Sequence, residues 1–476
     1  MTALRRPWAA VPVSLCAVVL VVALATAVQA GGTVQRLGYC GGDDWEPAVA
    51  ADSSGHVYVL ITHYAGDPAC DPASASNDSR IMIQVSNDDG RTFASPRVVS
   101  ESPGGITYPK QADPSIAVDR VDGSVYVSFL AYGISGGHTD VYVAKSVDAG
   151  ATFGQVVKAN DKNFQGVKGC KNCDHEKILA RGGNVYLAYG QAQYHFLSLS
   201  TDGGASFSQH TVDTNDVVTF AEAGAFDPAG NAWFAWGDCQ TSNCTGSPAT
   251  DYRVSETLAG TADTTFSGVI AQSPQGPPCP YGRCGFSYFG GQDSVAIDAS
   301  GRVYLAWQDG QQHTQRASPP VIRLSRCQAN CLAASSWSVV GRVDDKAATT
   351  CPDSSCFALF PSLVAGAKGQ LSATWMDDRN DALDGVVDHT DGWNLWYRTS
   401  TDGGSTWTTP GLRVSVFDPS QSQSGPNGFL FPYGDYTGLA LDPNCRNRAI
   451  MTWGEGHDWV GGPAAPGHVE YGTACS

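Results

Sequence analysis

A strand–turn–strand motif recurs along the chain and limits the possible folds more than any other feature. In each copy, a segment with alternating apolar residues leads into a short turn, and a second segment rich in Val, Tyr or Trp follows. Alternating apolar residues on both sides of a Gly turn are typical of a β-hairpin. Internal repetition of this kind indicates a repeat architecture. Seven copies occur, centred on Gly55, Gly123, Gly183, Gly230, Gly301, Gly369 and Asn447.

A second motif, Ser-x-Asp-x-Gly-x-x-aromatic, follows several of these hairpins. The Asp side chain can accept backbone N–H bonds inside such a turn, and the Gly can adopt a positive φ. The motif therefore predicts a stapled turn at the outer edge of each unit, and we expect its Asp residues to be structural. Four clear copies span Ser86–Phe93, Ser146–Phe153, Ser200–Phe207 and Ser400–Trp407.

Together the two motifs give four strands per unit, and a four-stranded unit repeated radially is a β-propeller blade. We predict an all-β fold, a β-propeller of seven four-stranded blades, with six blades as the alternative. The last unit ends soon after His468–Tyr471, so we expect Thr33–Arg36 to supply its outer strand and close the ring. On these motifs the chain resembles the sialidase-like, Asp-box (BNR-repeat) propeller superfamily over essentially all of residues 31–476, which we predict to be one domain. Catalytic sialidases of that superfamily are typically six-bladed.

The first thirty residues have the pattern of a signal peptide. Arg5 and Arg6 precede an apolar run, and Val28-Gln29-Ala30 places small residues at the −3 and −1 positions of a cleavage site. The alternative is an uncleaved membrane anchor, because the run is nearly long enough to span a bilayer. We predict a signal peptide over residues 1–30 and a secreted protein, extracellular or periplasmic.

The cysteines agree with export. The chain has 15 cysteines, and all but Cys16 follow the predicted signal peptide. The simplest interpretation in an oxidising compartment is local disulfides. Cys170 and Cys173 could instead belong to a metal or redox site near His175, although no matching fourth ligand is close in sequence. The predicted couples are Cys40/Cys70, Cys170/Cys173, Cys239/Cys244, Cys279/Cys284, Cys327/Cys331, Cys351/Cys356 and Cys445/Cys475.

The charge balance excludes two classes of partner. Asp and Glu number 46 against 29 Lys and Arg. Such a chain has no surplus of cations with which to neutralise nucleic-acid phosphates or an anionic membrane surface. We expect an extracellular glycan or polysaccharide as partner, no nucleic acid, no membrane after signal cleavage, and a monomer. We predict no cofactor and no catalytic metal, and leave room for a structural calcium ion.

The starts of the inner strands and the ends of the second strands should meet at one mouth of the central channel. The residues at these positions are mostly acidic or aromatic, and paired carboxyl groups are what glycoside hydrolysis requires. The alternative is that these polar residues only bind water in the channel and have no catalytic role. From this rim we select Asp378 as a catalytic candidate. The substrate-binding candidates are Trp45, Asp113, His175, Arg379, Asp435 and His457.

The resemblance implies further roles at this mouth. Sialidases bind the substrate carboxylate with three Arg residues, the first in an Arg-Ile-Pro motif, and here Trp45 stands in the matching stretch Trp45–Val49. Trp cannot replace a bidentate Arg, and Arg379 is the best remaining clamp candidate. The family nucleophile is a Tyr activated by a Glu; Tyr436 and Glu222 are similarly placed, and an ordinary rim aromatic is the alternative for Tyr436.

Three functions follow as hypotheses. The first is a glycoside hydrolase that acts on an extracellular glycan other than a sialoside. The second is a non-catalytic propeller that binds carbohydrate or protein. The third is a polysaccharide lyase, which would need cations to neutralise a uronate, and Lys110, Lys177 and Arg379 are the nearby ones. Because Trp45 stands where the clamp Arg should be, we predict under each hypothesis that the chain does not cleave sialic acid.

Overall fold

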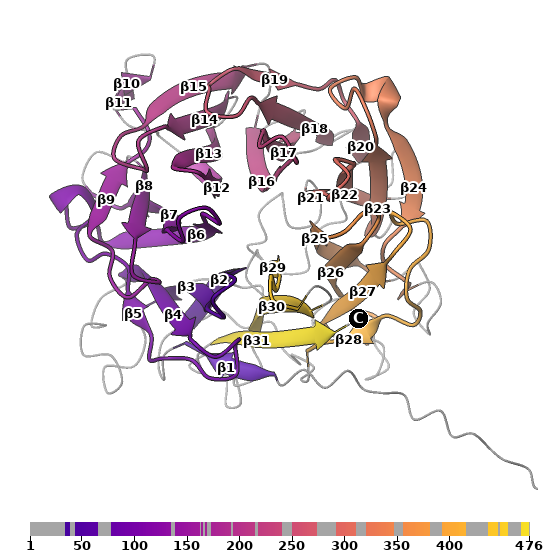
Figure 1. The fold of residues 1–476 in the computed structure, drawn as a ribbon, viewed down its shortest axis with the longest axis horizontal. Coiled ribbons are helices and arrows are strands. Elements are labelled where there is room, and N and C mark those ends of the chain that lie inside the picture. Colours follow the sequence, from indigo (N-terminus) through magenta and orange to yellow (C-terminus); the bar gives the residue numbers. More distant parts are fainter. Residues whose placement is uncertain are drawn as a thin grey trace, which may run out of the picture.

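The structure is a computed structural model. Seven four-stranded antiparallel sheets are arranged radially around a central channel (Figure 1). In the first six blades the strand nearest the channel is the first in sequence, and each later strand lies farther out. The prediction of seven blades is confirmed, and the six-bladed alternative is wrong. The structure describes residues 34–38, 43–64, 78–134, 139–161, 163–164, 167–168, 173–191, 194–214, 218–239, 250–273, 292–310, 320–346, 356–380, 393–415, 437–445, 448–455 and 468–475.

The first three blades follow one another along the chain. The first comprises β2 (Asp43–Ala51), β3 (Val57–Tyr64), β4 (Ser79–Ser86) and β5 (Arg97–Val98), and the second β6 (Lys110–Val118), β7 (Val125–Tyr132), β8 (Asp140–Ser146) and β9 (Gln155–Lys158). The third comprises β12 (Cys173–Arg181), β13 (Asn184–Gln191), β14 (Tyr194–Ser200) and β15 (Ser208–Asp213). A small hairpin of β10 (Asn163–Phe164) and β11 (Val167–Lys168) precedes the third blade, and the 3-10 turn η1 covers Pro103–Gly105.

The next three blades repeat the pattern. The fourth comprises β16 (Val218–Phe226), β17 (Ala232–Cys239), β18 (Thr250–Thr257) and β19 (Thr264–Phe266), with β20 (Ala271–Ser273) also paired to β18. The fifth comprises β21 (Asp293–Ile297), β22 (Val303–Gly310), β23 (Pro320–Cys327) and β24 (Ser338–Arg342), with the 3-10 turn η2 (Ala334–Ser336) before β24. The sixth comprises β25 (Ala358–Ala365), β26 (Leu371–Asp377), β27 (Asn394–Ser400) and β28 (Leu412–Arg413).

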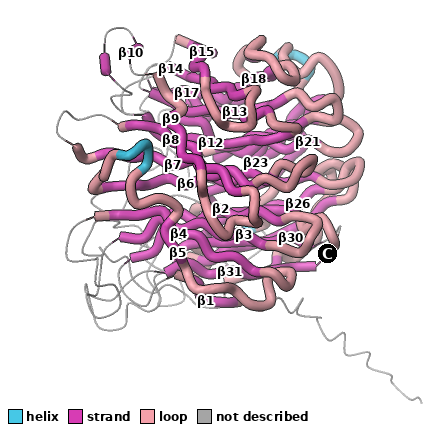
Figure 2. Tube along the Cα trace, turned by 60° about the vertical axis from the view of Figure 1, so that its left-hand side comes forward, coloured by secondary structure: helices cyan, strands magenta, loops and turns pink. Residues whose placement is uncertain are grey.

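The seventh blade is built from both ends of the described chain. β29 (Thr437–Leu441), β30 (Arg448–Glu455) and β31 (His468–Cys475) are its first three strands, and β1 (Gln35–Leu37) pairs antiparallel with β31 as the fourth. The views in Figures 1 and 2 both place β1 beside β31. The predicted closure of the ring by the N-terminal segment is therefore confirmed, with the strand ending at Leu37.

The Asp-box turns have the structure that their sequence predicts. In the first box, Asp88 Oδ1 accepts hydrogen bonds from Ser86 Oγ at 2.7 Å and from Thr92 N at 2.8 Å. The hydroxyl of Thr92 also donates a 2.7 Å bond to Asp88 Oδ2, and this bond together with the other two holds the pKa of Asp88 down at about 2. The same contacts recur at Asp148, Asp202 and Asp402. Since each box follows a third strand, the boxes lie at the end of the ring opposite the starts of the inner strands.

Large aromatic residues fill the spaces between neighbouring blades. Tyr58 and Tyr126, which occupy matching positions on β3 and β7, are both fully buried. Tyr58 also donates a 2.8 Å hydrogen bond to Asp52, so its hydroxyl is satisfied within the first turn. Trp375 and Trp453 are fully buried in the sixth and seventh blades. Burying side chains of this size contributes much of the free energy that holds one blade to the next.

The disulfide prediction holds in part. Cys327 and Cys331 are bonded as expected, and Cys173, Cys239 and Cys356 are also in disulfides. Cys445 is exposed and free, so the predicted couple Cys445/Cys475 is wrong. Cys475 lies on β31 directly opposite Arg448, at the end of the strand pair rather than at the exposed turn that carries Cys445.

Residues 1–33, including the predicted signal peptide, lie outside the described part of the chain. Within the described part, no helix combines the length and the apolar character needed to cross a membrane.

Candidate active site at the channel mouth

A β-bulge interrupts the inner strand of five blades close to its start. The register shifts between Trp45 and Ala48 in β2, and equivalent shifts occur in β6, β12, β16 and β25. In four of these strands the bulged residue has a positive φ of 53° to 55°, a conformation that non-Gly residues rarely adopt. Bulges re-aim side chains and are common near functional sites. The four residues are Glu46, Asp113, His175 and Phe360.

Three of these bulges bring acidic side chains together at one mouth of the channel. Glu46 is 2% exposed, and its Oε2 accepts a 2.6 Å bond from Thr62 and a 2.9 Å bond from the backbone N–H of Asp113. Its Oε1 accepts a 2.9 Å bond from the hydroxyl of Tyr64. Asp113 is half-buried and its carboxyl group is hydrogen-bonded to that of Asp174. The first three blades thus share one network of carboxyl groups, which we call the carboxyl cluster: Glu46, Asp113, Asp174 and Glu176.

Three members of the carboxyl cluster have pKa values raised above those of free carboxyl groups. Burial and the charge of Asp113 raise the pKa of Glu46 from 4.5 to about 8. Burial, the charge of Asp174 and the hydrogen bond to it raise the pKa of Asp113 from 3.8 to about 7. Burial and the charge of Asp113 raise the pKa of Glu176 well above its usual range. Burial and repulsion between neighbouring carboxylates both disfavour the charged form of a carboxyl group. These groups can therefore donate a proton at a higher pH than free carboxyl groups can.

Glu176 differs from the other members of the cluster. It is 1% exposed, and neither of its carboxyl oxygens makes a hydrogen bond with any residue of the described ranges. A buried carboxyl group without a partner is costly in its charged form. Burial therefore favours the neutral form of Glu176.

The structure brings together two of the predicted binding residues, Asp113 and His175, at the carboxyl cluster. His175 is 5% exposed and occupies the bulge of β12, directly between Asp174 and Glu176. Trp45 lies one residue before the bulge of β2, opposite Thr62, and is 1% exposed. Lys177 is half-buried, and its charge partly opposes the rise in the pKa of Asp113.

The sixth blade holds Arg379 and Asp378 in a different way. Arg379 bonds Asp377 through Nε at 2.8 Å and through Nη2 at 2.6 Å, and it bonds Asp345 at 2.8 Å. Its guanidinium also stacks on Trp396, 3.6 Å from the ring centre. Asp378 is fully buried and accepts a 2.6 Å bond from the backbone N–H of Phe357. The Nε and Nη2 donors of Arg379 are therefore engaged within the protein, and the substrate-binding role predicted for Arg379 remains a prediction.

The remaining candidates are only partly described. Glu222 lies in the bulge of β16, where the register shifts between Ala221 and Ala223, one position after the one that Glu46 and Asp113 occupy and level with Pro47 and Pro114. Its backbone is described, but its side chain is not. Tyr436, Asp435 and His457 lie outside the described residues. Their predicted roles stay predictions.

Glu46 and Glu176 lie at inner-strand starts, which the sequence assigns to the rim, but they are not among the candidates selected from the sequence. A signal for the site was nevertheless present, since an acid followed by Pro occurs at the same register in two blades, as Glu46-Pro47 and Asp113-Pro114. The partners Thr62 and Tyr64 come from the second strand of the first blade. Their contact with Glu46 depends on strand pairing that a single sequence does not state.

We find no arrangement of three or more His, Cys, Asp or Glu side chains suited to a metal ion within the described ranges. Glu46 instead accepts bonds from hydroxyl and backbone groups, and the carboxyl group of Asp113 is hydrogen-bonded to that of Asp174. Proton exchange and hydrogen bonding are therefore the chemistry that this arrangement offers.

Comparison with known proteins adds evidence on the fold. An ulvan polysaccharide lyase bound to a GlcA–Rha saccharide matches with a TM-score of 0.53 and 12% identity, over 91% of this chain and 97% of the other. A Hadza microbial sialidase matches with a TM-score of 0.47 and 12% identity, over 91% of this chain and 66% of the other. An α-L-arabinanase from Penicillium chrysogenum matches with a TM-score of 0.44 and 12% identity, over 79% and 96%.

At these identities the likeness shows the propeller fold alone. The named neighbours are carbohydrate-active propellers with different activities, and sialidases are among them. No protein-family model matches the sequence, and no curated protein does. Function must therefore be argued from the site.

Proposed function

We propose that this chain is a glycoside hydrolase that cleaves an extracellular glycan at the carboxyl cluster, with Asp113 as the general acid. The observation that carries the proposal is the Asp113–Asp174 pair, in which Asp113 has a pKa of about 7 and is accessible at the mouth of the channel. Glycosidic cleavage requires a carboxylic acid that is still protonated near neutral pH and can donate to the leaving oxygen.

The surrounding residues support this role. Glu46 accepts the backbone N–H of Asp113 and so fixes the bulge that presents the Asp113 side chain. Burial, and after it the charge of Asp174 and the hydrogen bond to it, raise the pKa of Asp113 and so favour its protonated form before a substrate binds. Glu222 occupies the matching bulge of the fourth blade and is our candidate for the second carboxyl group. Tyr436 and Asp378 remain further catalytic candidates.

Two observations support the proposal that the substrate is not a sialoside. Trp45 occupies the position at which the sialidase pattern requires an Arg, and it is buried. The guanidinium of Arg379 is engaged by Asp377 and Asp345. A substrate carboxylate would therefore lack the bidentate partners that make such recognition strong. We expect no release of sialic acid from a fluorogenic sialoside, and robust release would contradict this part of the proposal.

A polysaccharide lyase is the second candidate, favoured by one observation. Lys177 lies near enough to Asp113 to lower its pKa by charge, so a cation lies within electrostatic reach of a carboxyl group whose pKa is about 7. Such a pair suits a uronate carboxylate, whose charge must be neutralised before elimination. The likeness of the chain to the ulvan lyase supports the candidate by fold alone.

One experiment separates the candidates. The secreted chain is incubated with a panel of neutral and uronate-containing polysaccharides, and products are followed both as reducing ends and as the ultraviolet absorbance of unsaturated uronates. We expect reducing ends without unsaturation, and we expect Asp113→Asn to lower the rate by about a hundredfold or more. Asp263→Asn, at an exposed turn of the fourth blade, is the matched control and should keep full activity.

The other outcomes are equally informative. Unsaturated products would replace the hydrolase with the lyase. Binding of a glycan without any turnover would favour the non-catalytic propeller. Full activity in Asp113→Asn would remove Asp113 from the acid role and return attention to Glu222 and Tyr436.

A further inference from the structure

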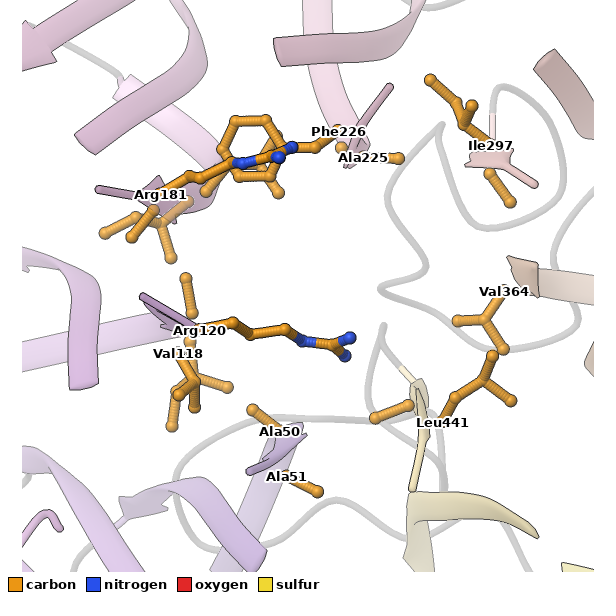
Figure 3. A pocket seen from close by; sticks show the side chains of 18 of the residues that line it. Ala50, Ala51, Val118, Arg120, Arg181, Ala225, Phe226, Ile297, Val364 and Leu441 are labelled. Atoms are coloured by element: carbon orange, nitrogen blue, oxygen red, sulfur yellow. The ribbon is translucent and has the colours of Figure 1, made fainter. Parts of the chain in front are cut away.

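The channel has a second mouth at the end where the Asp-boxes lie, and its walls differ from those of the carboxyl cluster. A cavity of about 640 Å³ lies here, within the range of small-molecule sites. All seven inner strands contribute to it, mostly with Ala, Val, Ile and Leu, as Figure 3 shows. Among the described residues that line it, only Arg120 and Arg181 are charged.

Arg120 points into this cavity from the turn that follows β6 (Figure 3). It is exposed, and we find no hydrogen bond or ion pair from its guanidinium to any residue of the described ranges. Arginine donors directed into a channel with apolar walls are available to a ligand, because nothing described in the protein uses them.

Arg181 marks the same mouth from the adjacent blade. The residue that directly follows the inner strand is Asp in five blades, whereas the matching position of the third blade is Arg181, the last residue of β12. Its guanidinium lies over the ring of Phe226, 5.9 Å from the centre, and donates a 3.3 Å bond to the carbonyl of Asp227. One bond leaves most of its donors free for a second acceptor. The five Asp residues are Asp52, Asp119, Asp227, Asp298 and Asp442.

The Asp side chains near this mouth accept hydrogen bonds from residues of the nearby turns. Asp298 accepts bonds from Ser300, Tyr304 and the backbone N–H of Gly369, all at 2.6 to 2.8 Å. Asp119 accepts the backbone N–H of Gly183 at 2.8 Å. Although burial opposes ionisation, the hydrogen bonds to Asp298 hold its pKa below the usual value, so that carboxylate keeps its charge and the mouth is unsuited to an anion of high charge. A single carboxylate, held by the two guanidinium groups, fits the charges better.

From these features we infer a second binding site, for an amphipathic monocarboxylate, at the Asp-box mouth of the channel. The carboxylate would bond Arg120 and Arg181, and its apolar body would lie along the small aliphatic side chains of the channel wall. This site is distinct from the carboxyl cluster at the opposite mouth, and its existence does not depend on the proposed hydrolase activity.

Titration calorimetry with octanoate tests the inference. We expect saturable binding at one site per chain, and octylammonium, which has the same apolar body and the opposite charge, should bind at least about tenfold more weakly. Arg120→Gln should weaken octanoate by about tenfold, the value of one charge-assisted bond. Arg120→Lys should recover only part of this loss, because Lys lacks the planar fork.

Matched variants complete the test. Arg91→Gln, which removes an exposed Arg of the first Asp-box, should leave octanoate binding unchanged. Asp113→Asn should also leave it unchanged, since that residue belongs to the other mouth. Ala225→Phe, which places a ring inside the cavity, should abolish binding, and a thermal melt checks that each variant folds.

Several results would overturn the inference. They are the absence of octanoate binding, equal binding of octanoate and octylammonium, an unchanged affinity in the Arg120→Gln, Arg181→Gln double variant, or an equal loss in Arg91→Gln.

Discussion

Gln35 and Tyr471 lie directly opposite each other in the antiparallel pair of β1 and β31, which closes the ring. The side-chain amide of Gln35 also donates a 2.9 Å bond to the carbonyl of Gly90, in the Asp-box of the first blade. Tyr471 is fully buried, and its ring packs edge-on against that of Phe93, with 4.8 Å between the ring centroids. The closing strand pair is thus held to the first blade from both of its strands.

We predict that weakening β1 destabilises the whole ring. Leu37 is 5% exposed and packs in a cluster with Val49, Val59 and Ile450. Leu37→Ala should lower the free energy of unfolding by about 2 to 5 kcal/mol, through lost burial and an unfilled cavity. Urea denaturation measures this. Arg36→Ala, at the exposed neighbour, is the control with a smaller effect. Equal stability of the wild type and a variant lacking Thr33–Arg36 would contradict closure by this strand.

The stability of the protein should fall as pH rises through the range in which Glu46 ionises. The folded state raises the pKa of Glu46 from 4.5 to about 8, so folding favours the protonated form. This contribution is complete below the unfolded pKa and is lost as pH rises toward about 8. The Glu46→Gln variant has a side chain of the same shape that cannot ionise. Its melting temperature should therefore decline less than that of the wild type across this window, and parallel declines would show that Glu46 does not titrate there.

Catalytic activity on a glycan should decline on the alkaline side with an apparent pKa of about 7, because Asp113 must be protonated to act as the acid. The pH profile of kcat/KM measures this value in the free enzyme. Asp174→Asn removes the charge that raises the pKa of Asp113, so the alkaline limb should move to lower pH in that variant. A limb that stays in place would indicate that a different group supplies the proton.

Loss of Arg379 should destabilise the fold strongly. Its guanidinium neutralises Asp377 and Asp345, both buried, and Arg379→Met would leave two carboxylates without their partner. We expect a loss of about 3 to 5 kcal/mol in the free energy of unfolding, measured by urea denaturation. Arg91→Met, at an exposed Arg, should have little effect. An unchanged stability together with a selective loss of glycan binding would instead support the clamp role predicted from sequence.

The sequence predicted the ring because each blade repeats its local signals. Gly turns and Asp-boxes are short-range features, and Asp88 needs only Ser86 and Thr92 to form its staple. The closing strand could be predicted because the last unit lacked a fourth strand. The couple Cys445/Cys475 failed because nearness in sequence does not fix where a turn directs its side chain.

The carboxyl cluster was harder to predict, since its contacts join three blades. Asp113 and His175 could be selected as rim residues, but the bond from Asp113 to Glu46 links residues far apart in the chain. The bulges that create it place non-Gly residues at positive φ, against their local preference. Such exceptions to local preference are expected at functional sites, and pattern reading alone misses them.

The shared seventh blade also determines the order of events during synthesis. β1 leaves the ribosome first among the strands of the ring, yet its partner β31 is made last. The earliest strand must therefore wait, with its backbone groups unpaired, until translation is almost finished. The first six blades can form as they emerge, but the circle can close only around a nearly complete polypeptide. A circular permutant opened at a blade boundary would remove this delay, because each blade would then be made from one continuous stretch of chain.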